Sequence, residues 1–110
     1  MEKLVKGDVV VLPFPFSDLS KSKKRPALVL AELEGDDVIL CQITSVARVD
    51  NYSVVLTNKD FKNGKLDVNS MIRPNKLFTA DSSIVLYKIS SLNEDKIKEI
   101  ENVVSNIFKK

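Results

Sequence analysis

Residues 7–30 read GDVVVLPFPFSDLSKSKKRPALVL, and this stretch indicates the fold more clearly than any other part of the chain. Two apolar runs that begin in it, residues 9–12 and 27–33, have the side chains typical of β-strands. Because Arg25 precedes Pro26, its backbone is restricted to extended conformations. We therefore expect Arg25 at the entrance of a strand, behind a basic loop, where its guanidinium suits a phosphate group. The cations of this region are Lys21, Lys23, Lys24 and Arg25.

Short extended segments separated by turn residues continue along the chain. Pro13 and Pro15 are expected to end the first strand, and Pro74 a later one, because proline cannot donate to a strand ladder. Residues 34–37, EGDD, predict a hairpin turn that leads into a returning strand at 38–44. The other predicted segments are strands at 53–57, 70–73 and 83–90 and a polar stretch at 58–69 with a turn at Asn63 and Gly64.

The C-terminal residues predict a helix. Asn93 is a favourable N-cap, and Glu94 and Asp95 carry negative charge in the first turn. Apolar residues then recur at helical spacing, namely Ile97, Ile100, Val103, Val104, Ile107 and Phe108. The chain is therefore expected to form a single domain, residues 1–110. We expect a mainly β fold with α, in which a small, bent antiparallel sheet carries a C-terminal helix.

The composition removes several kinds of chemistry. With no histidine and one cysteine, Cys41, the 110 residues lack the commonest acid–base catalyst and any cysteine-based zinc cage. We expect no metal and no cofactor. No apolar run approaches the roughly 20 residues that span a bilayer, and the N-terminal residues lack the apolar core of a signal peptide. These features predict a cytoplasmic protein without a membrane partner.

Positive charge is concentrated near the N-terminus. The net charge is only +2, but residues 1–30 hold six basic and three acidic side chains. A basic loop of this kind is typical of nucleic-acid binding, and it is equally typical of a solvated surface loop. Both interpretations stay open on charge alone.

Three blocks of sequence resemble the MazF/PemK family, the toxin halves of bacterial toxin–antitoxin pairs. The family opens with Gly-Asp and an apolar strand, followed by a loop, Arg-Pro and a second apolar strand. Residues 7–12 and 25–30 match this pattern in order. Residues 42–45, QITS, and residues 70–79, SMIRPNKLFT, match later blocks. The resemblance covers nearly the whole chain and implies an SH3-like barrel decorated with helices.

The resemblance also implies the site residues. Family members place an Arg at the strand entrance and a Thr after an Ile at the scissile phosphate, so Arg25 and Thr44 become the catalytic candidates. A surface salt bridge for Arg25 and simple strand propensity for Thr44 are the alternatives. Arg73 matches the Arg of an acid–base pair in some plasmid-maintenance members, but Asn75 replaces the acid, and the loop histidine of those members is missing. The candidate RNA-binding residues are Lys21, Lys23, Lys24, Phe16, Arg48, Arg73 and Asn75.

These residues predict a metal-independent endoribonuclease that acts through the ribose 2′-OH and leaves a 2′,3′-cyclic phosphate. Arg25 would stabilise charge, and Phe14 and Phe16 would either stack on bases or anchor the loop on the core. The partners implied by the resemblance are single-stranded RNA, a cognate antitoxin and a second copy in a homodimer. The alternatives are a nucleic-acid-binding module with little or no catalysis and an SH3-like protein-interaction domain.

Overall fold

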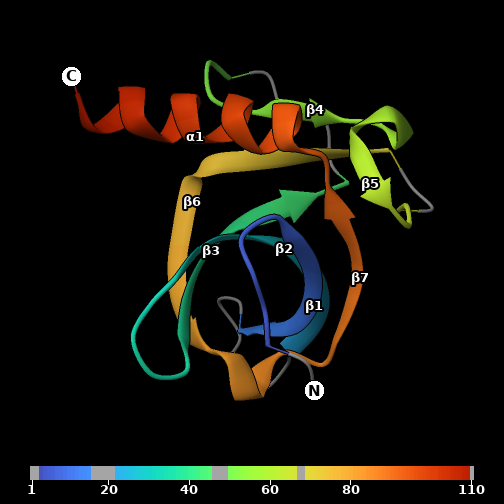
Figure 1. The fold of residues 1–110 in the computed structure, drawn as a ribbon, viewed down its shortest axis with the longest axis vertical. Coiled ribbons are helices and arrows are strands. Elements are labelled where there is room, and N and C mark those ends of the chain that lie inside the picture. Colours follow the sequence, from blue (N-terminus) through green and yellow to red (C-terminus); the bar gives the residue numbers. More distant parts are fainter. Residues whose placement is uncertain (1–2, 16–21, 46–49, 67–68, 110) are drawn as a thin grey trace.

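The strands of this protein curl into a bent sheet that a long helix crosses on one side (Figure 1). The structure, a computed structural model, describes residues 3–15, 22–45, 50–66 and 69–109. These residues form, in chain order, β1 (Asp8–Pro15), β2 (Ser22–Glu32), β3 (Asp37–Thr44), β4 (Val54–Leu56), the 3₁₀ turn η1 (Asn58–Asp60), β5 (Phe61–Asn63), β6 (Ser70–Asp81), the 3₁₀ turn η2 (Ser82–Ile84), β7 (Tyr87–Leu92) and α1 (Glu94–Phe108).

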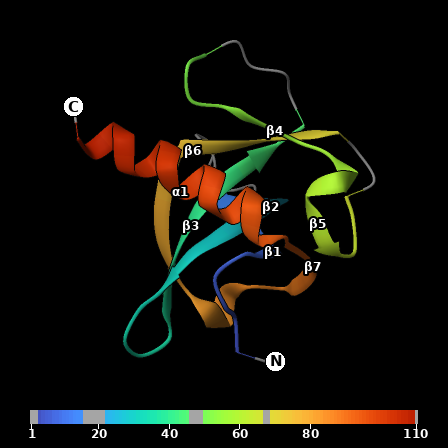
Figure 2. The same cartoon turned by 45° about the horizontal axis from the view of Figure 1, so that its top comes forward.

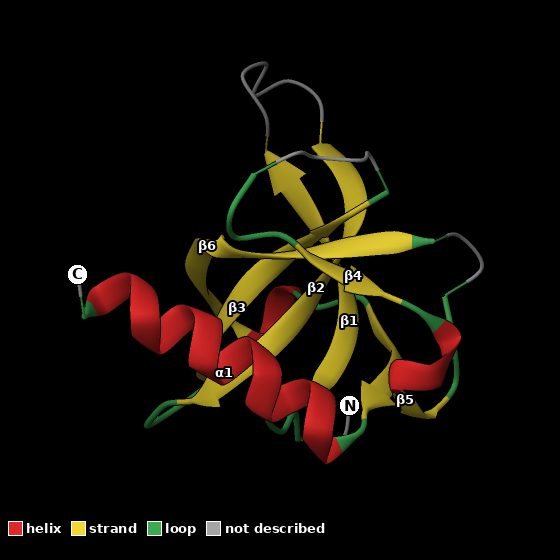
Figure 3. Ribbon diagram, turned by 90° about the horizontal axis from the view of Figure 1, so that it is seen from above, coloured by secondary structure: helices red, strands yellow, loops and turns green. Residues whose placement is uncertain are grey.

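The sheet is antiparallel throughout its described strands, which lie in the order β4-β6-β3-β2-β1-β7-β5. Figure 2 and Figure 3 show α1 lying against one face of this sheet. The architecture is a curled half-barrel with a C-terminal helix, and it confirms the predicted fold class. None of the helices in the described part of the chain is long and apolar enough to span a membrane.

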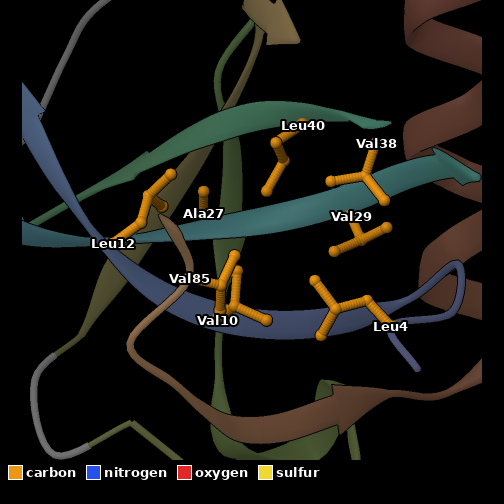
Figure 4. Packing of buried hydrophobic residues seen from close by; sticks show 8 residues of the cluster. All are labelled: Leu4, Val10, Leu12, Ala27, Val29, Val38, Leu40 and Val85. Carbon is orange, nitrogen blue, oxygen red and sulfur yellow. The ribbon is translucent and has the colours of Figure 1, made fainter. Parts of the chain in front are cut away.

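Two apolar clusters fill the two faces of the sheet. Along β2, Ala27 and Val29 point to one cluster and Leu28 to the other, because side chains alternate along a strand. The inner cluster, shown in Figure 4, comprises Leu4, Val10, Leu12, Ala27, Val29, Val38, Leu40 and Val85. The helix-side cluster comprises Val9, Leu28, Cys41, Ile43, Leu56, Ile72, Leu92 and Ile100. The continuous apolar run of β2 is thus explained by burial on both faces.

The predicted hairpin and helix are confirmed. The turn between β2 and β3 contains Gly35 at φ +73°, and Leu33 N–H donates to the Asp37 carbonyl over 3.0 Å. At the start of α1, the Asn93 side chain accepts a hydrogen bond from the Lys96 backbone over 2.9 Å. Both features depend on residues close together in sequence, which is why the pattern reveals them.

The prediction that Pro13 and Pro15 end the first strand is wrong. β1 pairs with β7 only as far as Val11, and beyond that point it pairs with β2 alone. A proline is tolerated there, because its missing N–H is not needed on the side that lacks a neighbouring strand. Lys23, Lys24 and Arg25 consequently lie within the paired strand β2, and Arg25 faces Leu12 of β1 rather than standing at a strand entrance.

Pro74 does not stop its strand either. β6 continues to Asp81, and its pairing with β3 shifts register between Gln42, opposite Arg73, and Cys41, opposite Leu77. Pro74 therefore lies in a bulge, where the extra residues are not required to bond to the ladder. The predicted strand at 83–90 is wrong in its first half, because Ser82–Ile84 form η2, capped by Asp81, and β7 begins only at Tyr87.

A buried carboxylate, that of Asp8, links β1 to β7 and to the segment before β1. Asp8 is only 2% exposed. Its oxygens accept hydrogen bonds from Val5 N–H over 2.9 Å and Ser91 Oγ over 3.1 Å, and Lys88 Nζ lies 3.1 Å away. Since Lys88 and Ser91 belong to β7, this carboxylate fixes the β1–β7 edge to the segment before β1. Asp8 is thus a structural residue with its bonding capacity filled.

Candidate functional site

The strand registers bring three predicted site residues to one face of the sheet. Gln42 of β3 lies opposite Ala27 of β2 and opposite Arg73 of β6. When the β2–β3 register is extended by two residues, Arg25 lies across from Thr44. Side chains two residues apart share a face. The side chains of Arg25, Thr44 and Arg73 therefore lie on the face of the inner cluster, beyond its last apolar residues.

These three side chains differ in exposure. Thr44 is 4% exposed and Arg73 8%, whereas Arg25 is half-buried. Arg25 is thus the most exposed of the three residues, although its Nε atom is buried. A separate pocket of about 260 Å3 lies where β2 and β3 approach the start of β6. Ile43 and Leu66, which belong to the helix-side cluster, place it mainly on the opposite face of the sheet. Its lining residues are Lys24, Arg25, Pro26, Ile43, Ser45, Leu66 and Ser70.

The other predicted RNA-binding residues are placed as follows. Lys23 and Lys24 are exposed on β2, where strand alternation puts Lys23 on the same face as Arg25. Asn75 is exposed in the β6 bulge. Phe16, Lys21 and Arg48 lie outside the described residues.

An acidic residue that sequence reasoning missed lies beside Arg73. The Oδ2 atom of Asp50 is 3.9 Å from Arg73 Nη2. The Asp50 carboxylate also accepts hydrogen bonds from the backbone of Tyr52 (2.8 Å) and Ser53 (2.7 Å). The backbone amides of Ser53 and Tyr52, and to a smaller extent the Arg73 charge, hold the pKa of Asp50 below its ordinary value of 3.8. The carboxylate is therefore ionised at neutral pH.

Sequence could reveal one half of the Asp50 arrangement. An Asp followed by Tyr52 and Ser53 in a polar stretch is typical of a turn in which the side chain bonds nearby backbone amides. The approach to Arg73 depends instead on the β4–β6 register, in which Val54 lies opposite Ile72, and no local pattern shows that register.

An apolar pocket of about 440 Å3 borders the site on the same face. Phe14 and Phe78 meet there edge to face, with ring centroids 5.0 Å apart and planes at 77°. Phe14 packs against the inner cluster, as the anchoring interpretation predicts. The pocket adjoins the basic residues through Leu12 and Gln42, and its other lining residues are Pro13, Phe14, Lys76, Leu77, Phe78, Thr79, Ala80 and Ile84.

The described residues offer little to a metal ion or to thiol chemistry. Within the described ranges, no three His, Cys, Asp or Glu side chains gather into a group that would hold a metal. Burial raises the pKa of the Cys41 thiol to about 12, so the reactive thiolate is not populated at neutral pH.

Comparisons with known proteins agree with this fold. The family described as "PemK-like, MazF-like toxin of type II toxin-antitoxin system" matches residues 5–108. No curated protein matches the chain.

Solved structures share the fold at low sequence identity. MazE–MazF from Deinococcus radiodurans is 19% identical, with 98% of each chain covered and a TM-score of 0.78. An endoribonuclease in complex with its cognate antitoxin from Mycobacterial species is 13% identical, with 96% of this chain and 95% of the other covered and a TM-score of 0.75. Toxin MazF-mt6 from Mycobacterium tuberculosis is 16% identical, with 93% and 96% covered and a TM-score of 0.71. The chain belongs to the PemK/MazF family of toxins of type II toxin–antitoxin systems.

Proposed function

We propose that this protein is a metal-independent endoribonuclease that cleaves single-stranded RNA at short specific sequences. The observation that carries the proposal is the convergence of Arg25, Thr44 and Arg73 from three strands onto one face. Membership of the toxin family supports it, because the resemblance implies that Arg25 and Thr44 flank the scissile phosphate.

The proposed reaction needs no metal or cofactor. The ribose 2′-OH gives its proton to solvent water and attacks the adjacent phosphorus, the bond to the 5′-oxygen breaks, and that oxygen takes a proton from water, so that the products are a 2′,3′-cyclic phosphate and a 5′-hydroxyl. Arg25 stabilises the negative charge that develops on the phosphorane, and loss of one such donor costs roughly 3–4 kcal/mol. The Thr44 hydroxyl donates to a phosphate oxygen or positions the 2′-OH. Since an Arg stays protonated, positioning and charge carry the catalysis.

The RNA backbone would follow the cations next to this centre. Lys23 shares a face with Arg25, whereas Lys24 points to the opposite face and lines the pocket of about 260 Å3 there. Lys23 and Arg73 would provide positive charge for the phosphates on either side of the cut, and Lys24 would contact RNA farther from it. We assign the remaining proposed contacts to Phe16, Lys21, Arg48 and Asn75.

The proposed partners are a cognate antitoxin and a second copy of this chain, in the cytoplasm. A flexible acidic segment of the antitoxin would suit the cations of β2 and exclude RNA from them. A homodimer would place two such sites on one particle.

A cleavage assay with a long unstructured RNA in the presence of a chelator tests the proposal. The wild type should give discrete fragments with 2′,3′-cyclic ends, and Arg25→Ala should lose activity by about 100-fold or more. Lys3→Ala is the matched control, because Lys3 is an exposed cation whose partner, Glu32, lies at the other end of β2. Equal cleavage by wild type and Arg25→Ala, with both folded, would contradict the assignment.

A binding module without catalysis is the second candidate function. The absence of histidine and the presence of Asn75 where some relatives carry an acid favour it. Under this alternative, the folded wild type binds RNA and leaves every sequence intact, and Arg25→Ala weakens only the binding.

A further inference from the structure

Arg73 has more donor capacity than the described residues use. Its side chain is 10% exposed, and its Nε atom is buried without a hydrogen-bond partner among those residues. The Nη2 atom lies 3.9 Å from Asp50 Oδ2, well beyond the roughly 2.7–2.9 Å of a direct charge-assisted hydrogen bond. A buried guanidinium held this loosely keeps donors available for another anion.

Asp50 is held in place by the turn that follows it, and not by Arg73. Its Oδ1 atom accepts the backbone N–H groups of Tyr52 and Ser53. Its Oδ2 atom accepts the Ser53 hydroxyl over 3.2 Å and faces Arg73. The carboxylate is therefore fixed by its own turn, independently of the guanidinium that it faces.

We infer that Asp50 is a positioning residue for Arg73, holding the guanidinium in the orientation in which it receives an RNA phosphate. This inference rests on the proposed function for its consequence in catalysis, but not for the pairing itself. Nothing in the sequence pattern or in the proposed reaction assigns a role to Asp50.

The loose spacing explains how one carboxylate supports a phosphate site. A buried cation without a nearby anion is costly, so Asp50 offsets the Arg73 charge while RNA is absent. A tight bidentate pair would occupy the planar donor fork that phosphate needs. At 3.9 Å, Asp50 biases the orientation of the fork without forming a close hydrogen bond to its Nη2 atom, which stays available to a phosphate oxygen.

One substitution separates this role from the structural role of the turn. Asp50→Asn retains a carbonyl oxygen for the two backbone amides and places an NH2 group where Oδ2 faced Arg73. The turn is preserved, but the attraction between the Asp50 carboxylate and the Arg73 guanidinium is lost, because the amide NH2 and the guanidinium are both hydrogen-bond donors. Asp81→Asn is the matched control, since Asp81 Oδ1 also accepts a backbone amide, that of Ser83 over 2.9 Å, at the far end of β6.

The kinetic test uses the full chain and a single-site RNA. Asp50→Asn should lower kcat about tenfold, the size of effect expected when a binding group is misplaced, with little change in KM. Asp81→Asn should stay within about twofold of wild type. In an Arg73→Gln background, Asp50→Asn should add less than about twofold, because the two residues act as one unit. Two results overturn the inference. One is an equal loss of kcat from Asp50→Asn in the wild-type and Arg73→Gln backgrounds, and the other is no loss of kcat from Asp50→Asn in the protein that retains Arg73.

A second readout requires no RNA and no activity. By NMR, the Arg73 Nε–H should exchange with water faster in Asp50→Asn than in wild type, and at the wild-type rate in Asp81→Asn. Equal exchange in all three proteins overturns the inference even if RNA is cleaved. If the wild type cleaves no RNA, the proposed function fails, and the exchange rates still decide whether Asp50 orients Arg73.

Discussion

Asp8 and Arg73 are both buried charged side chains on the same sheet, and they are partnered in opposite ways. Asp8 has a backbone amide, a hydroxyl and an ammonium group within 3.1 Å. Arg73 has one carboxylate at 3.9 Å and a buried Nε without a partner among the described residues. A buried charge with all its bonds made stabilises a fold. A buried charged group with unused hydrogen-bond donors is typical of a ligand-binding site.

Replacing the satisfied charge should have the largest effect on stability. Asp8→Ala leaves Val5 N–H and the Ser91 hydroxyl without an acceptor in a buried place. We expect the free energy of unfolding to fall by about 3 kcal/mol. Urea denaturation measures it, with Ser91→Ala as the control that removes one bond without stranding a charge. A loss no larger than that of the control would break the contrast with Arg73.

Replacing the unsatisfied charge should affect activity and spare the fold. Arg73→Met keeps the length of the side chain and removes a loosely paired guanidinium, so the unfolding free energy should be unchanged or higher. The specificity constant kcat/KM for RNA should fall by about 2 kcal/mol, roughly thirtyfold, the worth of a lost hydrogen bond to a charged group. Strong destabilisation of Arg73→Met would show that its charge is structural after all.

The smallest expected effect is on the pH dependence of stability, to which the carboxylates of Asp50 and Asp81 contribute. Backbone hydrogen bonds, from Ser53 and Ser83 respectively, hold both pKa values below the ordinary 3.8. A carboxyl whose pKa is lowered in the folded state stabilises the fold above its unfolded pKa. That contribution disappears as the pH falls through the folded value.

The measurement is urea unfolding of wild type, Asp50→Asn and Asp81→Asn at neutral pH and well below pH 3.8. The gap between wild type and each variant should narrow in acid. If the difference in unfolding free energy widens in acid, folding raises the pKa of that carboxyl and does not lower it.

The sequence predicts what depends on near neighbours. The hairpin at Gly35 and the cap at Asn93 follow from residues within a few positions of each other, and both are confirmed. Pro13 and Pro74 mislead, because a proline ends a strand only where its N–H is needed, and that depends on which strand lies beside it. Strand order cannot be read from the residues themselves.

The site divides in the same way. The pairing of Arg25 with Thr44 on one face is implied by family resemblance and is not visible in the periodicity of either strand. Asp50 and Arg73 are distant in sequence and meet because β4, which follows Asp50, pairs with β6, with Val54 opposite Ile72. A chain read one segment at a time therefore yields the cations and misses the anion that faces one of them.

The pairing of β1 with β7 affects the order in which the protein folds during its synthesis. Asp8 and Ser91 are 83 positions apart in sequence, so the β1–β7 ladder cannot form until β7 is available. Contacts between such distant residues fold slowly, because a long loop must be closed first. During synthesis the hairpin β2–β3 can form early, whereas Asp8 makes its contacts with Lys88 and Ser91 only after β7 has been synthesised. Any activity of the site should therefore be absent from the growing chain until β7 has been synthesised.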